Sequence, residues 1–80
     1  MKIYEYERCL TTDLGTKQYP TYEIDENRFK SECEFLEAGG YEVFDDNAEC
    51  KGYFKRHDTL NAVTYIVFKL VADTEAGWRV

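Results

Sequence analysis

The chain has 80 residues, a formal net charge of −6, and 44% hydrophobic and 16% aromatic residues. This length predicts a single domain, residues 1–80, with a small core, and the apolar content is too high for a disordered chain. No apolar run reaches the length of a membrane-spanning helix, and charged residues interrupt the N-terminal segment, where a secretory signal would be apolar. We therefore expect a cytoplasmic protein that has no membrane partner.

Two strands are expected before the first helix. Residues 2–10 alternate in polarity, and three side chains share the face that we expect to line the core: Tyr4, Tyr6 and Leu10. Residues 11–16 are expected to form a loop, after which residues 19–24 return as a second strand. Pro20 has no N–H to donate to a neighbouring strand, so the second strand is expected at an edge of the sheet.

A helix is predicted for residues 26–38. Asp25 is suited to cap its N-terminus, and Gly39 and Gly40 end it because glycine readily takes a left-handed backbone conformation. Helical spacing gives an inward stripe and an outward charged set: Phe29, Cys33 and Leu36 inward, and Lys30, Glu34 and Glu37 outward. Phe35 falls outside the stripe, and we expect it to lie under a loop.

Three strands and two turns are predicted after the helix: strands at 41–44, 50–56 and 62–72, and turns at 45–47 and 57–61. The last strand is apolar on both faces, as is typical of a central strand. One helix covers only one face of a sheet. We expect the other face to be covered by the C-terminal segment with Trp78, by curling of the sheet, or by a second copy of the chain.

The predicted order of elements is ββαβββ. The expected fold class is α+β, a single two-layer domain in which one helix packs on an antiparallel sheet of four to five strands.

The cysteines and acidic turns do not predict a metal site. Cys9, Cys33 and Cys50 are widely separated, without the close pairing of zinc ligands, and we expect them to be reduced. The segment 45–49 is similar to the start of a calcium loop, but the sixth and twelfth loop positions fall on Cys50 and Arg56 instead of Gly and Glu. No metal or other cofactor is expected.

His57 is the one histidine of the chain. It could act as a general base oriented by Asp58, but adjacent residues of a strand point to opposite faces, and the spacing supplies no nucleophile. Lys51, Lys55 and Arg56 make this segment a basic patch, which favours a contact with acidic groups. We therefore expect no catalytic site. A small enzyme that uses His57 is kept as a third hypothesis, after the two given below.

Negative charge is concentrated in the middle of the chain. Between Glu23 and Glu49, ten carboxylates stand against two cations, so these 27 residues carry −8 and the rest sums to +2. Such a cluster either keeps an aromatic-rich domain soluble or mimics a nucleic-acid backbone toward a basic groove. In the second case the partner-binding residues are six carboxylates and three aromatic anchors: Glu34, Glu37, Glu42, Asp45, Asp46, Glu49, Tyr41, Phe44 and Tyr53.

In its size, clustered acid and aromatic content, the chain resembles the small proteins with which bacteriophages and mobile elements block host defence, including anti-CRISPR proteins and DNA-mimicking inhibitors. The resemblance implies a non-enzymatic inhibitor in the host-cell cytoplasm that binds a basic nucleic-acid-binding protein or a nucleoprotein complex. Direct binding of nucleic acid is not expected, because like charges repel. The alternative is a small structural or regulatory homodimer in which the acid cluster serves solubility only.

Overall fold

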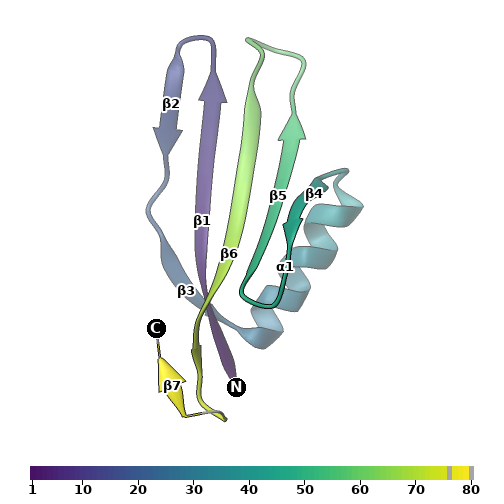
Figure 1. Cartoon of the computed structure of the whole chain (residues 1–80). Coiled ribbons are helices and arrows are strands. Elements are labelled where there is room, and N and C mark those ends of the chain that lie inside the picture. The colour runs from purple at the N-terminus through teal and green to yellow at the C-terminus, as the bar shows by residue number, and fades with distance from the viewer. Residues whose placement is uncertain (76, 80) are drawn as a thin grey trace.

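The computed structural model describes residues 1–75 and 77–79, with the backbone alone for Trp78 and Arg79. Over these residues the chain forms one helix and seven strand segments: β1 (Lys2–Thr12), β2 (Gly15–Gln18), β3 (Tyr22–Asp25), α1 (Glu26–Ala38), β4 (Glu42–Asp46), β5 (Cys50–Arg56), β6 (Val63–Asp73) and β7 (Trp78–Arg79). They make one antiparallel sheet in the order β2-β1-β6-β5-β4, with β3 also paired to β1 and β7 to β6 (Figure 1). The α+β class is as predicted, but the described sheet has more strand segments than the four to five expected.

One additional strand comes from a hairpin at the N-terminus. β1 continues to Thr12, and a tight turn at Asp13 and Leu14 leads directly into β2. The Leu14 N–H donates to the Thr12 hydroxyl at 3.1 Å, and Gly15 has a φ of +132°, a conformation that favours glycine. The loop predicted for residues 11–16 is therefore wrong, because most of these residues pair in the sheet.

Pro20 separates β2 from β3. Both strands pair with β1, and Tyr22 of β3 lies opposite Tyr6. The strand predicted for residues 19–24 begins only at Tyr22, because the chain leaves β1 around the proline, which has no N–H for the ladder.

The helix has the predicted bounds. The backbone N–H of Arg28 donates to Asp25 Oδ1 at 2.8 Å, which caps the N-terminus of α1 as expected. At the other end Gly40 has a φ of +85°, so the glycine pair leads the chain out of the helix and back toward β4.

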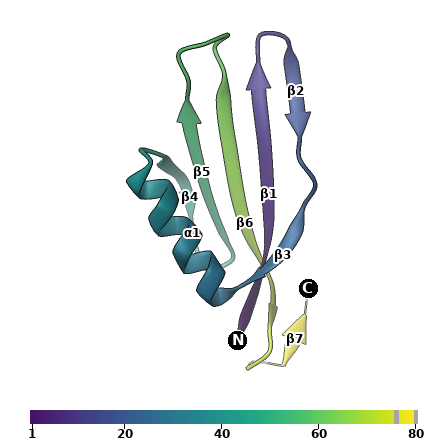
Figure 2. The same cartoon turned by 180° about the vertical axis from the view of Figure 1, so that it is seen from behind.

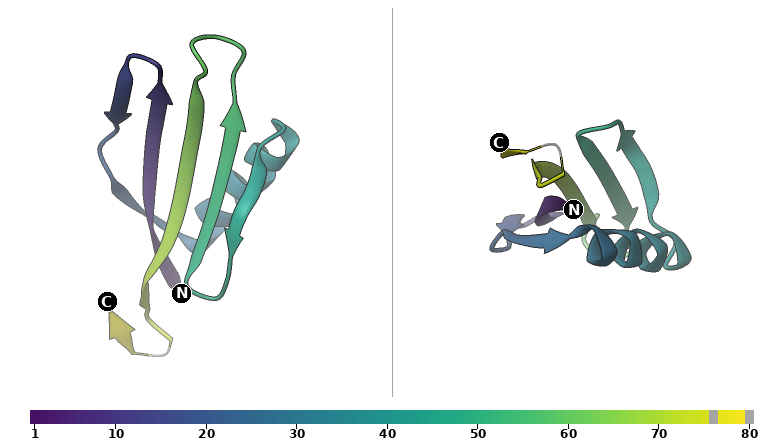
Figure 3. Two further views of the ribbon diagram at one scale, coloured as in Figure 1. Left: turned by 45° about the horizontal axis from the view of Figure 1, so that its top comes forward. Right: turned by 90° about the horizontal axis from the view of Figure 1, so that it is seen from below.

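The core lies between α1 and one face of the sheet (Figures 2 and 3). The Phe29 ring stacks on Tyr4, with centroids 3.9 Å apart, and meets Phe68 of β6 edge-on at 5.2 Å. Cys33 and Leu36 are buried in the same cluster, which confirms the inward stripe, and Tyr4 and Tyr6 of β1 line the core as predicted. Leu10 was expected on the same core face, but it is only half-buried and lies outside this cluster, at the β1–β2 hairpin beyond the helix.

β4 forms one edge of the sheet and lies further along the chain than the strand predicted for residues 41–44. The turn that follows starts at Asn47, whose Oδ1 accepts from two backbone N–H groups beyond it, each at 2.9 Å. The turn predicted from Asp45 is therefore misplaced, since both aspartates belong to the strand. The pairing of β4 with β5 shifts by one residue at Phe44.

The second face of the sheet carries no covering layer among the described residues (Figure 3). The C-terminal segment pairs with the end of β6 as β7, so its backbone extends the sheet; the Trp78 side chain lies outside the described residues. β2 and β4 are separate edges, so the sheet does not close on itself. α1 is neither long nor apolar enough to cross a membrane.

Phe35 lies on the surface of α1. Its side chain is 74% exposed, so the expectation that a loop covers it is wrong. Its helical position lies outside the stripe that contacts the sheet.

Candidate partner-binding surface

The carboxylates expected to bind a partner lie along β4, at one edge of the sheet, and on α1 (Figure 1). Asp46 is opposite Lys51, on the side of the sheet that faces α1. Glu42 and Asp45 face the open side. The strand thus divides its carboxylates between the two sides of one edge.

Among the described residues, no cation forms an ion pair with these carboxylates. Four ion pairs occur among the described residues, and none of them includes any member of the set that we call the acidic edge: Glu34, Glu37, Glu42, Asp45, Asp46 and Glu49. The turn after β4 is held by Asn47, whose Nδ2 donates to Asp45 Oδ1 at 3.1 Å. A neutral amide leaves the negative charge of Asp45 in place, and only Asp46 has a cation, Lys51, at the neighbouring position of β5.

Glu37 and Tyr53 contribute to the acidic edge differently from the prediction. Tyr53 is 0% exposed, and its hydroxyl donates to Glu37 Oε2 at 2.9 Å. Burial raises the pKa of the Tyr53 phenol well above its usual value, and hydrogen bonds with Cys33 and Glu37 raise it further, so the phenol remains a donor. Tyr53 is therefore a core residue and not a partner anchor, and Glu37 turns partly inward instead of lying opposite the helix stripe.

Phe44 is the best-placed aromatic anchor. Its ring is 50% exposed and lies against Gly52 of β5 on the open side of the sheet. It meets Tyr65 edge-on, with centroids 6.0 Å apart. Because Glu42 and Asp45 face the same side, the edge presents an aromatic ring between two carboxylates.

Three further residues complete the surface. Tyr41 is half-buried, with the Lys55 ammonium 5.7 Å from its ring centroid, so only part of its ring is available to a partner. Phe35 and Val43 are exposed apolar side chains near the carboxylates in sequence, and neither was expected to be an anchor. The signal for Phe35 was its position outside the helix stripe.

His57 lacks the partner expected for a general base. Its Nε2 lies 2.8 Å from Thr64 Oγ1, so its ring is held by a hydroxyl of β6 and not by Asp58. In the part of the chain that the structure describes, no group of three His, Cys, Asp or Glu side chains is arranged to hold a metal ion. The three cysteines are free, and Cys33 is buried.

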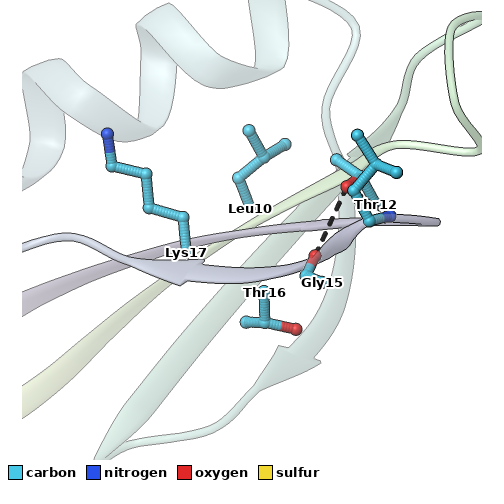
Figure 4. A pocket seen from close by; sticks show the side chains of 6 residues that line it. Leu10, Thr12, Gly15, Thr16 and Lys17 are labelled. Carbon is cyan, nitrogen blue, oxygen red and sulfur yellow. Dashed lines mark hydrogen bonds between the residues drawn. The ribbon is translucent and has the colours of Figure 1, made fainter.

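A shallow hollow of about 280 Å³ lies at the β1–β2 hairpin (Figure 4). Leu10 and Lys17 point to one side of the hairpin and Thr16 to the other. The Thr12 hydroxyl donates to the Gly15 carbonyl at 3.4 Å. Lys17 is the one titratable side chain of this lining, so the hollow has no acid–base pair.

The chain matches no family model, no curated protein and no solved structure.

Proposed function

We propose that the protein is a non-enzymatic inhibitor that presents the acidic edge to the basic nucleic-acid-binding groove of another protein or nucleoprotein complex, in the manner of an anti-CRISPR or DNA-mimicking protein. The observation that carries the proposal is the set of six carboxylates on β4, its turn and α1 that lack a cationic partner among the described residues.

The physical basis is counterion release. A groove lined by Lys and Arg binds nucleic acid largely through neutralised phosphates, and fixed carboxylates on a folded edge replace those phosphates without the nucleic acid. Phe44 adds an apolar contact next to the charge, of the kind that dominates interface energies.

The test starts with capture from a bacterial lysate on the immobilised protein at low and at high salt. The retained protein is then purified, and its binding to its own nucleic acid is measured as this protein is added. We expect retention that weakens steeply with salt and competition at a one-to-one ratio. Retention that is independent of salt, or a saturated partner that still binds its nucleic acid, contradicts the proposal.

A second candidate function, a structural or regulatory homodimer, is favoured by the open face of the sheet. Tyr65 is 38% exposed there, next to Phe44, and Val63 and Val67 are only partly buried. A second copy on this face would cover these side chains. The acidic edge would then serve solubility only.

A further inference from the structure

A cavity of about 320 Å³ lies beside β1 and β3, at the side of the sheet away from β4. Five residues line this cavity, which we call the tyrosine pocket: Tyr6, Arg8, Tyr19, Pro20 and Tyr22. The Tyr19 N–H still donates to the Arg8 carbonyl at 3.0 Å, but pairing stops at Pro20 and resumes at Tyr22. The cavity therefore exists because the proline lifts the chain off β1, and its volume falls in the range of small-molecule sites, about 300–1,000 Å³.

The pocket offers an open aromatic surface. The Tyr22 ring stacks on Tyr6 with centroids 4.9 Å apart and an interplanar angle of 23°. Tyr6 is buried, whereas Tyr22 is 46% exposed. One face of Tyr22 is thus covered by Tyr6, and the ring remains accessible to a flat ligand. Burial raises the pKa of Tyr6, so its phenol stays neutral and adds no negative charge.

One cation, Arg8, lines the pocket, and a second, Lys17, lies next to it on the Tyr19 ring. The Arg8 guanidinium carbon lies 4.7 Å from the centroid of the Tyr19 ring, and the Lys17 ammonium lies 4.9 Å from it. Among the described residues neither cation forms an ion pair with a carboxylate. A guanidinium held over a ring keeps its N–H groups free for an anion in a defined place.

The pocket lining and the strand β4 bring no free carboxylate to these cations. The five lining residues include no carboxylate. Glu32, whose charge contributes to raising the pKa of Tyr6, accepts a hydrogen bond from Arg28 Nε at 2.8 Å. The sheet order puts β6 and β5 between β1 and β4. Three strand spacings amount to about 14 Å, which exceeds the Debye length of about 8 Å at physiological salt.

We propose that the tyrosine pocket binds a nucleotide, with the base stacked on Tyr22 and the phosphate held by Arg8 and Lys17. A flat ring with an attached anion uses both the aromatic and the cationic part of the site, whereas an acidic peptide uses only the cations. The inference does not rest on the acidic edge. It departs from the expectation that the protein contacts no nucleic acid, which considered the clustered carboxylates alone.

The test compares ligands that carry one or both parts of a nucleotide. Calorimetry measures the binding of five ligands to the protein: adenosine monophosphate, adenosine, inorganic phosphate, a short single-stranded polyadenylate and a polyglutamate peptide. We expect the monophosphate to bind more tightly than adenosine or phosphate. If the polyadenylate binds more tightly than the monophosphate, the natural ligand is a single-stranded nucleic acid. If the two bind with equal affinity, the natural ligand is a free nucleotide.

Variants locate the binding in the pocket. Tyr22→Ala should weaken monophosphate binding about tenfold, and Tyr22→Trp should retain it, because base stacking requires only an aromatic face. Arg8→Gln should remove the preference for the monophosphate over adenosine. Tyr65→Ala, a comparably exposed tyrosine on the open side of the sheet, is the matched control and should leave binding unchanged.

Four results overturn the inference. In the first two, the monophosphate binds no more tightly than inorganic phosphate, or the polyglutamate peptide binds more tightly than the polyadenylate. In the third, monophosphate binding is unchanged in both Tyr22→Ala and Arg8→Gln. In the fourth, Tyr22→Ala and Tyr65→Ala lose the same amount of monophosphate affinity. Arg8 is exposed, so Arg8→Gln remains informative even where Tyr22→Ala fails to fold.

Discussion

The Phe44 ring lies so close to the backbone of Gly52 that a Cβ at position 52 would be 2.5 Å from Phe44 Cζ. An aromatic side chain of the edge strand thus occupies the space that a side chain of β5 would fill. Phe44 can therefore take this position on the open face only because residue 52 has no side chain.

Gly52→Ala should displace the Phe44 ring. We expect a loss of about 1–3 kcal/mol in the free energy of unfolding, because overpacking forces the ring out of its contacts. In a Phe44→Ala background the same change should be neutral or slightly stabilising, since alanine restricts the unfolded chain more than glycine. Urea denaturation of the four proteins of this cycle measures the coupling. Additive effects at the two positions would show that the ring does not depend on Gly52.

Tyr53→Phe should destabilise the protein by about 1–3 kcal/mol at neutral pH, because it removes a hydrogen bond to the Glu37 carboxylate from a buried site. Denaturation with urea checks this. The matched control is Tyr65→Phe, which removes a hydroxyl that has no hydrogen-bond partner among the described residues. An equal effect of the two changes would contradict the role of the Glu37 contact.

The same residue predicts a dependence on alkaline pH. The folded-state pKa of Tyr53 lies above its ordinary value of 10.0, so the folded protein holds this proton more tightly than the unfolded chain. This contribution to stability is complete below about pH 10 and is lost as the pH rises toward the folded-state pKa. We therefore expect stability to fall above pH 10, and less steeply in Tyr53→Phe, as measured by denaturation across that range. Parallel pH profiles of the two proteins would be the opposite result.

Removing charge from the acidic edge should have opposite effects on stability and binding. In the double variant Glu34→Gln/Glu42→Gln, the free energy of unfolding should rise by a few tenths of a kcal/mol, since two like charges 10 Å apart in water repel by about 0.4 kcal/mol. Retention of the basic partner should fall. The control Asp58→Asn/Glu75→Gln removes the same charge from exposed positions away from the edge and should leave retention unchanged. Equal retention in both double variants would exclude the edge as the binding surface.

Tyr65→Lys tests the open face as a dimer interface. If two copies pack there, sedimentation at micromolar concentration should show a dimer for the natural chain and a monomer for this variant, because a lysine buried between two sheets loses its hydration. Phe35→Lys places the same charge on the surface of α1 and should leave the dimer intact. A natural chain that sediments only as a monomer removes this candidate.

The helix could be predicted from the sequence because its signals are local. Asp25, the stripe through Phe29 and the glycine pair each act within a few residues, and the structure confirms all three. The strands around Pro20 were harder to predict, because one proline is compatible with an edge strand and also with a break between two strands. Only the pairing of both segments with β1 decides between them.

The side that each carboxylate of β4 faces could not be predicted, because strict alternation fails where the pairing shifts at Phe44. The burial of Tyr53 could not be predicted from its neighbours in the sequence either. It lies between Lys51 and Lys55 on one side of β5, which makes that side look polar, whereas in the structure the tyrosine is buried against the helix layer and the lysines flank it. Contacts between segments distant in the sequence decide these positions.

The two outer strands of the sheet are poor templates for further strand addition. β4 carries Glu42, Asp45 and Asp46 within five residues, so an identical edge approaching it would bring equal charges together. At the opposite margin β2 has only four residues before Pro20 interrupts the backbone donors. Charge at one margin and a proline at the other thus protect a sheet with a bare, aromatic face from growing into fibrillar aggregates.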